Sequence, residues 1–132
     1  MAKSSIHFNV VKSNSEAHNK REVELDYNFK DLEKDNYHNE KQTINEAEKE
    51  CRKYCKYVSG RKMMANAEPI REAVVNLNAN HTEKDLFKLS QALRDNFGID
   101  CFQIHIHRDE GKEKNDLNHH AHMLFKWVDR RE

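Results

Sequence analysis

The sequence has no excess of charge of either sign, no long apolar run and few cysteines. Its 132 residues contain 23 Lys and Arg against 23 Asp and Glu, so the formal net charge is zero. This balance argues against a protein that coats nucleic acid through bulk positive charge, although a local basic face is compatible with it. No apolar run approaches the roughly 18 to 20 residues that cross a bilayer, and no secretory signal follows Met1.

The three cysteines are an odd and small set, which fits a reducing cytoplasm better than a disulfide framework. Cys51 and Cys55 are one helical turn apart, so a cysteine-based zinc site is an alternative. However, C-x₃-C is not the usual zinc spacing, which favours partly buried free thiols. We therefore expect a soluble, cytoplasmic chain with no membrane partner, long enough for one domain with one modest core.

The order of apolar and polar residues predicts six elements. Residues 6–11 alternate between apolar and polar until the last position, which predicts a strand, and the polar stretch 12–42 predicts a long loop with one short helix. The S/T-x-x-E capping box that begins at Thr43 predicts a helix to about Gly60. After Pro69, residues 70–79 alternate as a strand. Thr82 begins a second helix, which carries leucines at helical spacing and ends at Gly98.

Two further strands follow, at about 102–107 and 120–127, so the predicted order is β-α-β-α-β-β. This order predicts an α+β fold, an antiparallel sheet with both helices packed on one face. No internal repeat or low-complexity tract is present.

Histidines are concentrated in and between these last two strands, because five of the nine lie from His105 to His122. His105 and His107 alternate with apolar residues in the first strand, as do His120 and His122 in the second. Period-two alternation gives each strand one apolar face and one histidine face. If opposite residues have position numbers that sum to about 227, all four histidines share a face, with opposite pairs roughly 4.5 to 5.5 Å apart. The same register sends the apolar side chains to the other face, namely Phe102, Ile104, Ile106, Met123, Phe125 and Trp127.

Imidazoles at this spacing can converge on one cation, and three histidines with open coordination positions are typical of a catalytic metal. The alternative interpretation is that these histidines are simply solvated at the surface. That would be the better interpretation for a single histidine, whereas four on one face favour a metal site. His119 points to the core face or the turn and is not part of this set. Asp109 and Glu110 have three possible roles. They could orient a histidine N–H, one of them could act as a general base, or both could be ordinary turn residues.

Two motifs in the chain resemble those of HUH-type relaxases, most closely the plasmid mobilization and recombination (Mob/Pre) family. The first is H-x-D-E at His107 to Glu110, followed by H-x-H at His120 to His122. The second is H-N-x-R at His18 to Arg21, and Asp35-Asn36-Tyr37 resembles the family's later L-N-Y element. The loop between Glu110 and His120 is longer than in the family and contains no proline.

The resemblance implies an HUH endonuclease-like fold and a metal-dependent, site-specific single-strand DNA endonuclease and strand transferase. Such a relaxase nicks an origin of transfer and stays attached to the 5′ end, in plasmid or transposon mobilization and conjugation. It implies that residues 1–132 are one nicking domain, the N-terminal part of a longer protein. The implied partners are single-stranded origin DNA and accessory mobilization or coupling proteins.

The resemblance also assigns roles to residues. The implied cofactor is Mn²⁺ or Mg²⁺, with His107, His120 and His122 as ligands and Glu110 as a supporting carboxylate. The implied nucleophile is His18, with Tyr37 as the alternative, and Arg21 would hold a phosphate. The remaining DNA contacts are expected at Asn19, Lys20, Arg21, His105 and Arg108.

Two other functions are compatible with the sequence. Tyr54 and Tyr57 lie on the helix that carries the nucleophile in tyrosine-type HUH enzymes, which would indicate a rolling-circle replication initiator or a transposase. A non-catalytic metal-binding or DNA-binding module is the second alternative. Basic residues further from the histidines are interpreted as a solvated face, as helical charge runs usually are; they are Lys53, Lys56, Arg61 and Lys62.

Overall fold

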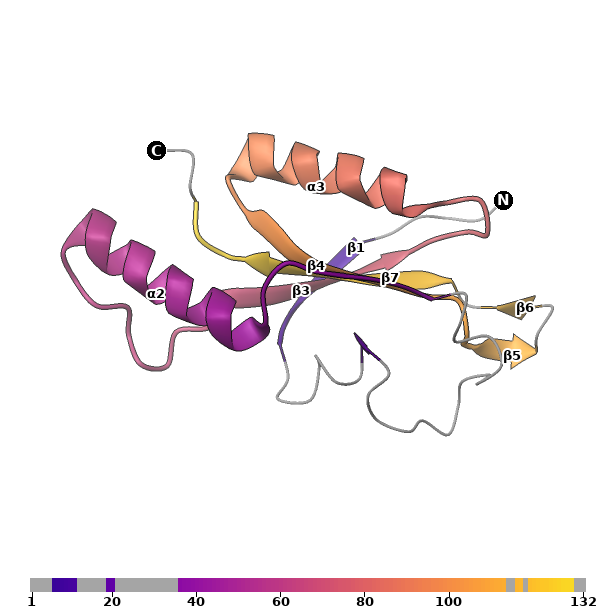
Figure 1. The fold of residues 1–132 in the computed structure, drawn as a ribbon, viewed down its shortest axis with the longest axis horizontal. Helices are drawn as coiled ribbons and strands as arrows, with labels where there is room; N and C mark the ends of the chain where they lie inside the picture. The colour runs from indigo at the N-terminus through magenta and orange to yellow at the C-terminus, as the bar shows by residue number, and fades with distance from the viewer. Residues whose placement is uncertain (1–5, 12–18, 21–35, 114–115, 118, 130–132) are drawn as a thin grey trace.

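The computed structural model describes residues 6–11, 19–20, 36–113, 116–117 and 119–129, and these form a five-stranded antiparallel sheet with two helices (Figure 1). The strands lie in the order β1-β3-β7-β4-β2, so the histidine-bearing strands β4 and β7 are neighbours inside the sheet. The predicted α+β class and antiparallel sheet are confirmed. The sheet strands are β1 (Ile6–Val10), β2 (Tyr37–Glu40), β3 (Ile70–Asn76), β4 (Asp100–His107) and β7 (His120–Lys126).

Two parts of the chain expected to be loops contain strands. β2 pairs with β4 along its whole length, although its sequence, YHNE, has no apolar alternation. Its backbone hydrogen bonds to β4 take the place of the missing pattern, because the edge of a sheet stabilises whatever chain can pair with it. The loop that follows β4 contains the small hairpin β5 (Gly111–Glu113) and β6 (Asp116–Leu117).

Both predicted helices are present, with the predicted ends. In α2 (Ile44–Ser59), the Thr43 hydroxyl accepts from the Glu46 N–H at 3.1 Å, and the Glu46 carboxylate accepts from the Thr43 N–H at 3.2 Å. This reciprocal box satisfies donors that a helix start otherwise leaves unpaired. α3 (Glu83–Phe97) ends at Gly98, whose φ of 73° is left-handed. Neither described helix is long and apolar enough to cross a bilayer.

The two helices pack on opposite faces of the sheet, which corrects the prediction that both lie on one face. α3 places Leu86 against a cluster that includes Ile104, Ile106 and Met123. α2 places Ala47 and Cys51 against Ile70, Phe102 and Leu124. The strand register puts Leu124 on the face of His122, so α2 covers part of the histidine face and leaves the rest of that face to the histidines. Figure 1 shows α3 above the sheet and α2 at the left of the view, beside one end of the sheet.

Of the apolar side chains expected on the non-histidine face, Phe102 lies on the other face, whereas Trp127 lies at the edge of the predicted face and lines a pocket with Leu93 and Phe97 of α3. A register shift between Cys101 and Gln103 inserts an extra residue, and Phe102 therefore joins the α2 cluster instead of the α3 cluster. Trp127 lies just beyond β7, is 42% exposed, and has its ring centroid 5.2 Å from that of Phe8. Period-two alternation was valid only within the unbroken part of each strand.

Candidate metal centre

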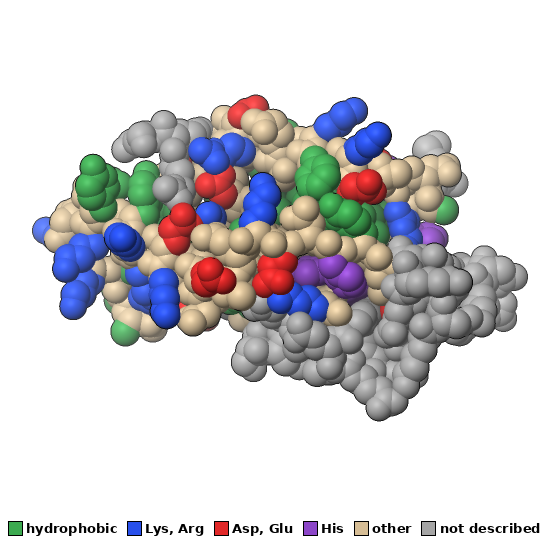
Figure 2. Space-filling model, in the orientation of Figure 1, with side chains coloured by type: hydrophobic (Ala, Val, Ile, Leu, Met, Phe, Trp, Pro, Cys, Tyr) green, Lys and Arg blue, Asp and Glu red, His purple; other side chains and the backbone are tan. Residues whose placement is uncertain are grey.

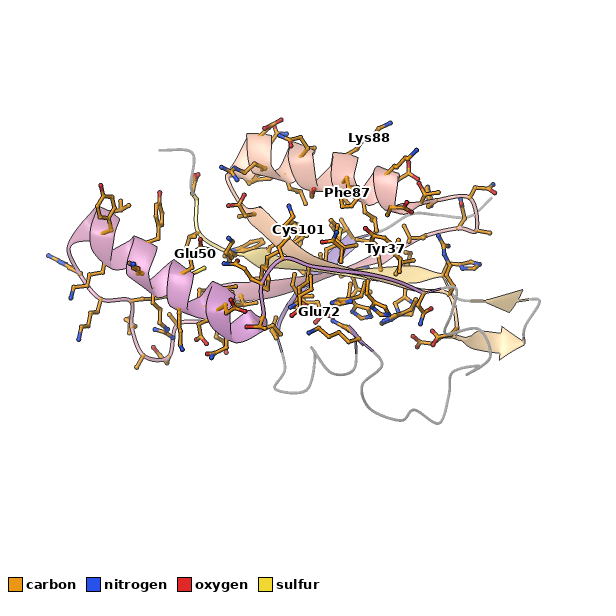
Figure 3. The ribbon with its side chains drawn as sticks, viewed as in Figure 1. Tyr37, Glu50, Glu72, Phe87, Lys88 and Cys101 are labelled. Atoms are coloured by element: carbon orange, nitrogen blue, oxygen red, sulfur yellow. The ribbon has the colours of Figure 1, made fainter. Side chains whose placement is uncertain are left out.

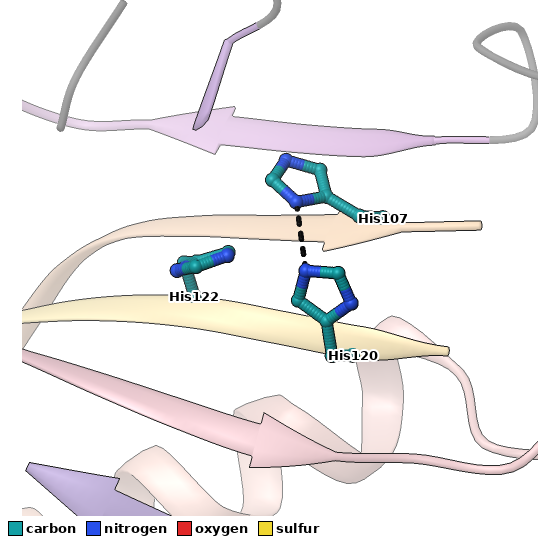
Figure 4. Close-up of side chains that lie close together, drawn as sticks. All are labelled: His107, His120 and His122. Carbon is teal, nitrogen blue, oxygen red and sulfur yellow. Dashed lines mark hydrogen bonds between the residues drawn. The ribbon is translucent and has the colours of Figure 1, made fainter. Parts of the chain in front are cut away.

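The predicted register between the histidine strands is confirmed. His107 lies opposite His120, and His105 lies opposite His122, so both pairs of position numbers sum to 227. His107, His120 and His122 converge at this end of the sheet, with one ring nitrogen of each within 4.8 Å of the others (Figure 4). The strands are central and rigid, which is why three side chains can be held together without a dedicated loop.

His107 is fixed in one tautomer by the backbone. Its ring is fully buried, and its Nε2 lies 2.8 Å from the carbonyl oxygen of Asn19. A carbonyl oxygen only accepts hydrogen bonds, so Nε2 must carry the proton and donate it. The lone pair of Nδ1 therefore faces His120, whose Nε2 is 3.2 Å away. Two nitrogens bound to one cation at about 2.1 Å each would be separated by about 3.0 to 3.4 Å, so this spacing suits a shared metal ion.

His122 is oriented by a carboxylate that the sequence analysis did not identify. Its Nδ1 forms a hydrogen bond with Oε1 of Glu72 on β3, and Glu72 is only 9% exposed. Figure 3 shows Glu72 beneath the sheet. Metal-binding histidines commonly donate one ring N–H to a carboxylate in this way, which turns the other nitrogen toward the metal. The available signal was a charged residue at an inward-facing position of a strand, between Ile70 and Val74.

Glu110 lies beside the same cluster. Its Oε2 is 3.2 Å from Nε2 of His120 and 3.6 Å from Nδ1 of His107, and its side chain is 15% exposed. The structure thus brings the predicted supporting carboxylate against two of the three histidines, despite the long loop that separates Glu110 from His120. A carboxylate here adds negative charge next to a bound cation. It makes the site more suitable for hard ions such as Mn²⁺ or Mg²⁺ than a site of imidazoles alone would be.

A second row of hydrogen bonds lies behind the cluster. His105 is fully buried, with Nε2 2.8 Å from Oε1 of Gln103 and Nδ1 2.8 Å from Nδ1 of His38 on β2. Gln103 in turn donates from Nε2 to the carbonyl of Gln42 at 2.8 Å, which orients its oxygen toward His105. His38 went unnoticed in the sequence because β2 was not predicted. The burial of His105 favours a supporting position over its expected contact with DNA.

The expected DNA-contacting residues lie in different settings. Asn19 is buried under the cluster, and Lys20 forms an ion pair with Glu40 at 2.6 Å. The Arg108 guanidinium donates to the carbonyls of Asn78, at 3.0 Å, and of His81, which ties it to the loop between β3 and α3. Burial lowers the pKa of Arg108, although the nearby Glu83 carboxylate partly opposes this effect.

His119 and Asp109 flank the cluster without belonging to its three nitrogens. Burial lowers the pKa of His119, and the charges of Arg108 and His120 act in the same direction. The backbone carbonyl of His119 accepts from the N–H of Leu77 at 3.0 Å, in keeping with a structural role. Asp109 is completely buried two residues after the end of β4.

Only some of the candidate nucleophiles are among the residues that the structure describes. His18 and Arg21 lie outside them. Tyr37 is opposite Ile106 in the register and packs against the α3 cluster, so the structure does not bring it to the histidine face. Tyr54 donates to the carbonyl of Asp129 at 3.5 Å.

The cysteines do not form a metal site among the described residues, where the three histidines are the one group with suitable spacing. All three thiols are free, with Cys51 buried in the α2 cluster. Burial raises the pKa of Cys101 to about 12. The interpretation as partly buried free thiols fits this structure.

The donor set at the cluster fits a divalent metal ion. Three imidazoles, two of them oriented by an acceptor on the remote nitrogen, are combined with an adjoining carboxylate. Imidazole ligands suit transition ions and carboxylates suit Mg²⁺ and Mn²⁺, so the mixture is compatible with Mn²⁺.

Comparison with solved structures finds a likeness over most of the chain. The MobM relaxase domain (MOBV; Mob_Pre), solved with manganese and bound to plasmid pMV158 oriT DNA, superposes with a TM-score of 0.62 at 17% identity. The match covers 93% of this chain and 69% of that one. No family model and no curated protein matches the sequence. The chain therefore has the fold of a MOBV relaxase domain, and its histidine triad is consistent with the HUH motif predicted from the sequence.

Proposed function

We propose that the chain is an HUH-type relaxase, which cleaves one DNA strand at an origin of transfer and keeps the 5′ end covalently attached. The observation that carries this proposal is the triad of His107, His120 and His122 on adjacent strands of a relaxase fold. A divalent cation held by these residues supplies Lewis-acid polarisation of the scissile phosphate. Mn²⁺ and Mg²⁺ are the preferred candidates.

The residues around the triad would keep its geometry constant. The Asn19 carbonyl and the Glu72 carboxylate each hold one ring by its remote nitrogen, so neither ring has to reorient when a phosphate arrives. Glu110 would balance the positive charge of the site, because its Oε2 lies beside the two histidine nitrogens that would face the cation.

In the proposed reaction, a ring nitrogen of His18 attacks the scissile phosphorus. A nitrogen–phosphorus bond forms, the bond from phosphorus to the 3′ oxygen breaks, and that oxygen leaves and takes up a proton. The choice of His18 is supported by Asn19, which follows it directly in the sequence and whose carbonyl oxygen accepts a hydrogen bond from His107. Arg21 would hold a phosphate oxygen through its planar guanidinium, and Asn19, Lys20 and Arg108 would contribute to the DNA interface.

The test uses an oligonucleotide that carries the origin found in the DNA flanking the gene. With Mn²⁺ we expect a protein–DNA adduct that survives denaturing electrophoresis, and we expect none with EDTA, His18→Ala or His120→Ala. His7→Ala, an exposed histidine on edge strand β1, is the matched control and should form adduct normally.

The chemistry of the adduct distinguishes the candidate nucleophiles. A phosphohistidine bond is labile in acid, whereas a phosphotyrosine bond is stable. An acid-stable adduct lost in Tyr54→Phe or Tyr57→Phe would favour the replication initiator or transposase, and one lost in Tyr37→Phe would favour Tyr37. Metal and DNA binding without any adduct would leave a non-catalytic module as the better description.

A further inference from the structure

A groove of about 610 Å³ lies between α2 and the loop that follows it, and it shares no residue with the metal centre. In Figure 2, Lys and Arg side chains gather over this end of the molecule, at the left of the view. We call this feature the α2 groove. Apart from Arg52, its lining comes from both sides and consists of Lys53, Lys56 and Tyr57 of α2 and Lys62, Met63 and Ala65 of the loop.

The α2 groove is held open by one arginine. The Arg52 guanidinium donates to the carbonyls of Met64 at 3.1 Å, Ala65 at 3.4 Å and Ala67 at 3.3 Å, and it also pairs with Glu48 at 3.1 Å. These bonds tie the loop to the side of the helix. The two walls of the groove are therefore positioned before any ligand arrives, which lowers the entropy cost of binding.

The side chains that line the α2 groove combine positive charge with an exposed aromatic ring. Lys53 and Tyr57 are four residues apart and share a helix face, with Lys56 beside them and Lys62 on the opposite wall. Tyr57 is 87% exposed, although its ring is large and apolar. No acidic side chain lines the groove, and within the described ranges no ion pair is found for the three lysines.

We propose that the α2 groove binds single-stranded DNA away from the metal centre, an inference that rests on the proposed function. Lysines beside an aromatic platform are the combination by which proteins bind single strands, with cations on phosphates and a base stacked on the ring. An acidic peptide would use the lysines alone and would leave the exposed Tyr57 ring and the Met63 side chain unexplained.

The position of the groove defines which part of the strand it would hold. α2 has 16 residues and is about 24 Å long, and its two buried residues, Ala47 and Cys51, lie in its first half. The groove lies along its second half, which extends away from the sheet (Figure 1). It would therefore bind nucleotides several positions from the scissile phosphate and would add affinity with little base specificity.

The experiment measures fluorescence anisotropy of a labelled oligothymidylate of about 20 nucleotides, in EDTA so that no metal-dependent reaction occurs. We expect Lys53→Ala/Lys56→Ala to weaken binding at least tenfold and to reduce the slope of log affinity against log salt by about 1.4, because two lysines no longer neutralise a phosphate each. Lys84→Ala/Lys88→Ala is the matched control, because these exposed lysines have a similar spacing on α3. It should bind as the unaltered chain does.

A second pair of variants tests stacking. Tyr57→Ala should weaken binding by about fivefold or more, and Tyr57→Phe should keep it, because the ring and not the hydroxyl carries the base. Equal binding by the lysine variants and the unaltered chain would overturn the inference, as would polyglutamate competing as well as unlabelled oligothymidylate. Adduct formation with Mn²⁺, measured separately, decides the proposed function, so the two can fail independently.

Discussion

Glu72 places a negative charge on a central part of the sheet, 9% exposed and hydrogen-bonded to His122. Burying a carboxylate is unfavourable unless it is paired, so its presence on β3 requires a partner that offsets the cost. A histidine that binds a cation through its other nitrogen is such a partner, since the charge on the metal is felt through the ring. Glu72 therefore belongs to the candidate metal centre, where it would hold His122 without being a metal ligand itself.

We expect Glu72→Gln to weaken Mn²⁺ binding by about 10- to 100-fold, the range typical when a residue that orients a metal ligand is replaced. Glutamine keeps an oxygen that can accept from Nδ1 of His122, so the weaker binding reports the missing charge. The measurement is calorimetric titration with Mn²⁺, with the exposed Glu68→Gln as control. Equal affinities in the two variants would remove Glu72 from the site.

Cys101 gives the protein a pH dependence in the alkaline range. Burial raises the pKa of this thiol from 9.0 to about 12, so it stays protonated in the folded state while it ionises near pH 9 in the unfolded state. Its contribution to stability is therefore complete below pH 9 and declines as the pH rises above that value. Urea unfolding at pH 8 and pH 10.5 should show a smaller alkaline loss of stability in Cys101→Val than in the unaltered chain. An identical loss in both proteins would mean that Cys101 ionises freely in the folded state.

At the scale of elements, the histidine face is divided between α2 and the metal centre. α2 covers Ile70, Phe102 and Leu124, and the histidines occupy the continuation of the same face along β4 and β7. The ion pair between Lys126 and Glu50, at 2.5 Å, lies at the boundary between β7 and α2. α3 closes the opposite face, so the sheet is packed on both sides and the triad rests on a fixed support.

The end of α2 depends on the backbone conformation of one glycine. Gly60 has a φ of +74°, and a Cβ at this position would meet nothing within 4 Å. We expect Gly60→Ala to lower the free energy of unfolding by about 1 kcal/mol, the conformational cost of this region for an L-residue. Gly60→Asn should be less destabilised, because asparagine tolerates the left-handed region. Urea denaturation of both variants measures this, and equal stability of Gly60→Ala and the unaltered chain would contradict the assigned turn.

Elements with local signals were predictable and those that depend on distant partners were not. The capping box at Thr43, the glycines after both helices and the pairing of His107 with His120 all follow from short-range patterns. β2 has no such pattern and exists because β4 offers it an edge. The shift beside Phe102 and the contact of Glu72 with His122 likewise depend on which strands become neighbours.

At the scale of the whole molecule, a net charge of zero hides an uneven distribution. Largely buried acidic groups, Glu72 and Glu110 among them, lie at the histidine cluster, whereas three exposed lysines line the α2 groove at the other end. Composition alone argued against a coat of positive charge, and the structure agrees that the basic character is local. Under the two proposals, the histidine end of the sheet binds the cation together with the scissile phosphate, and the α2 groove binds other phosphates of the strand.

The central claim is that His107, His120 and His122 form one divalent metal site, and calorimetric titration of the EDTA-treated protein with Mn²⁺ tests it most directly. We predict one site per chain, lost in His120→Ala/His122→Ala and retained in His7→Ala, with circular dichroism confirming that each variant is folded. Mn²⁺ binding of unchanged affinity and stoichiometry in the folded double variant would contradict the claim.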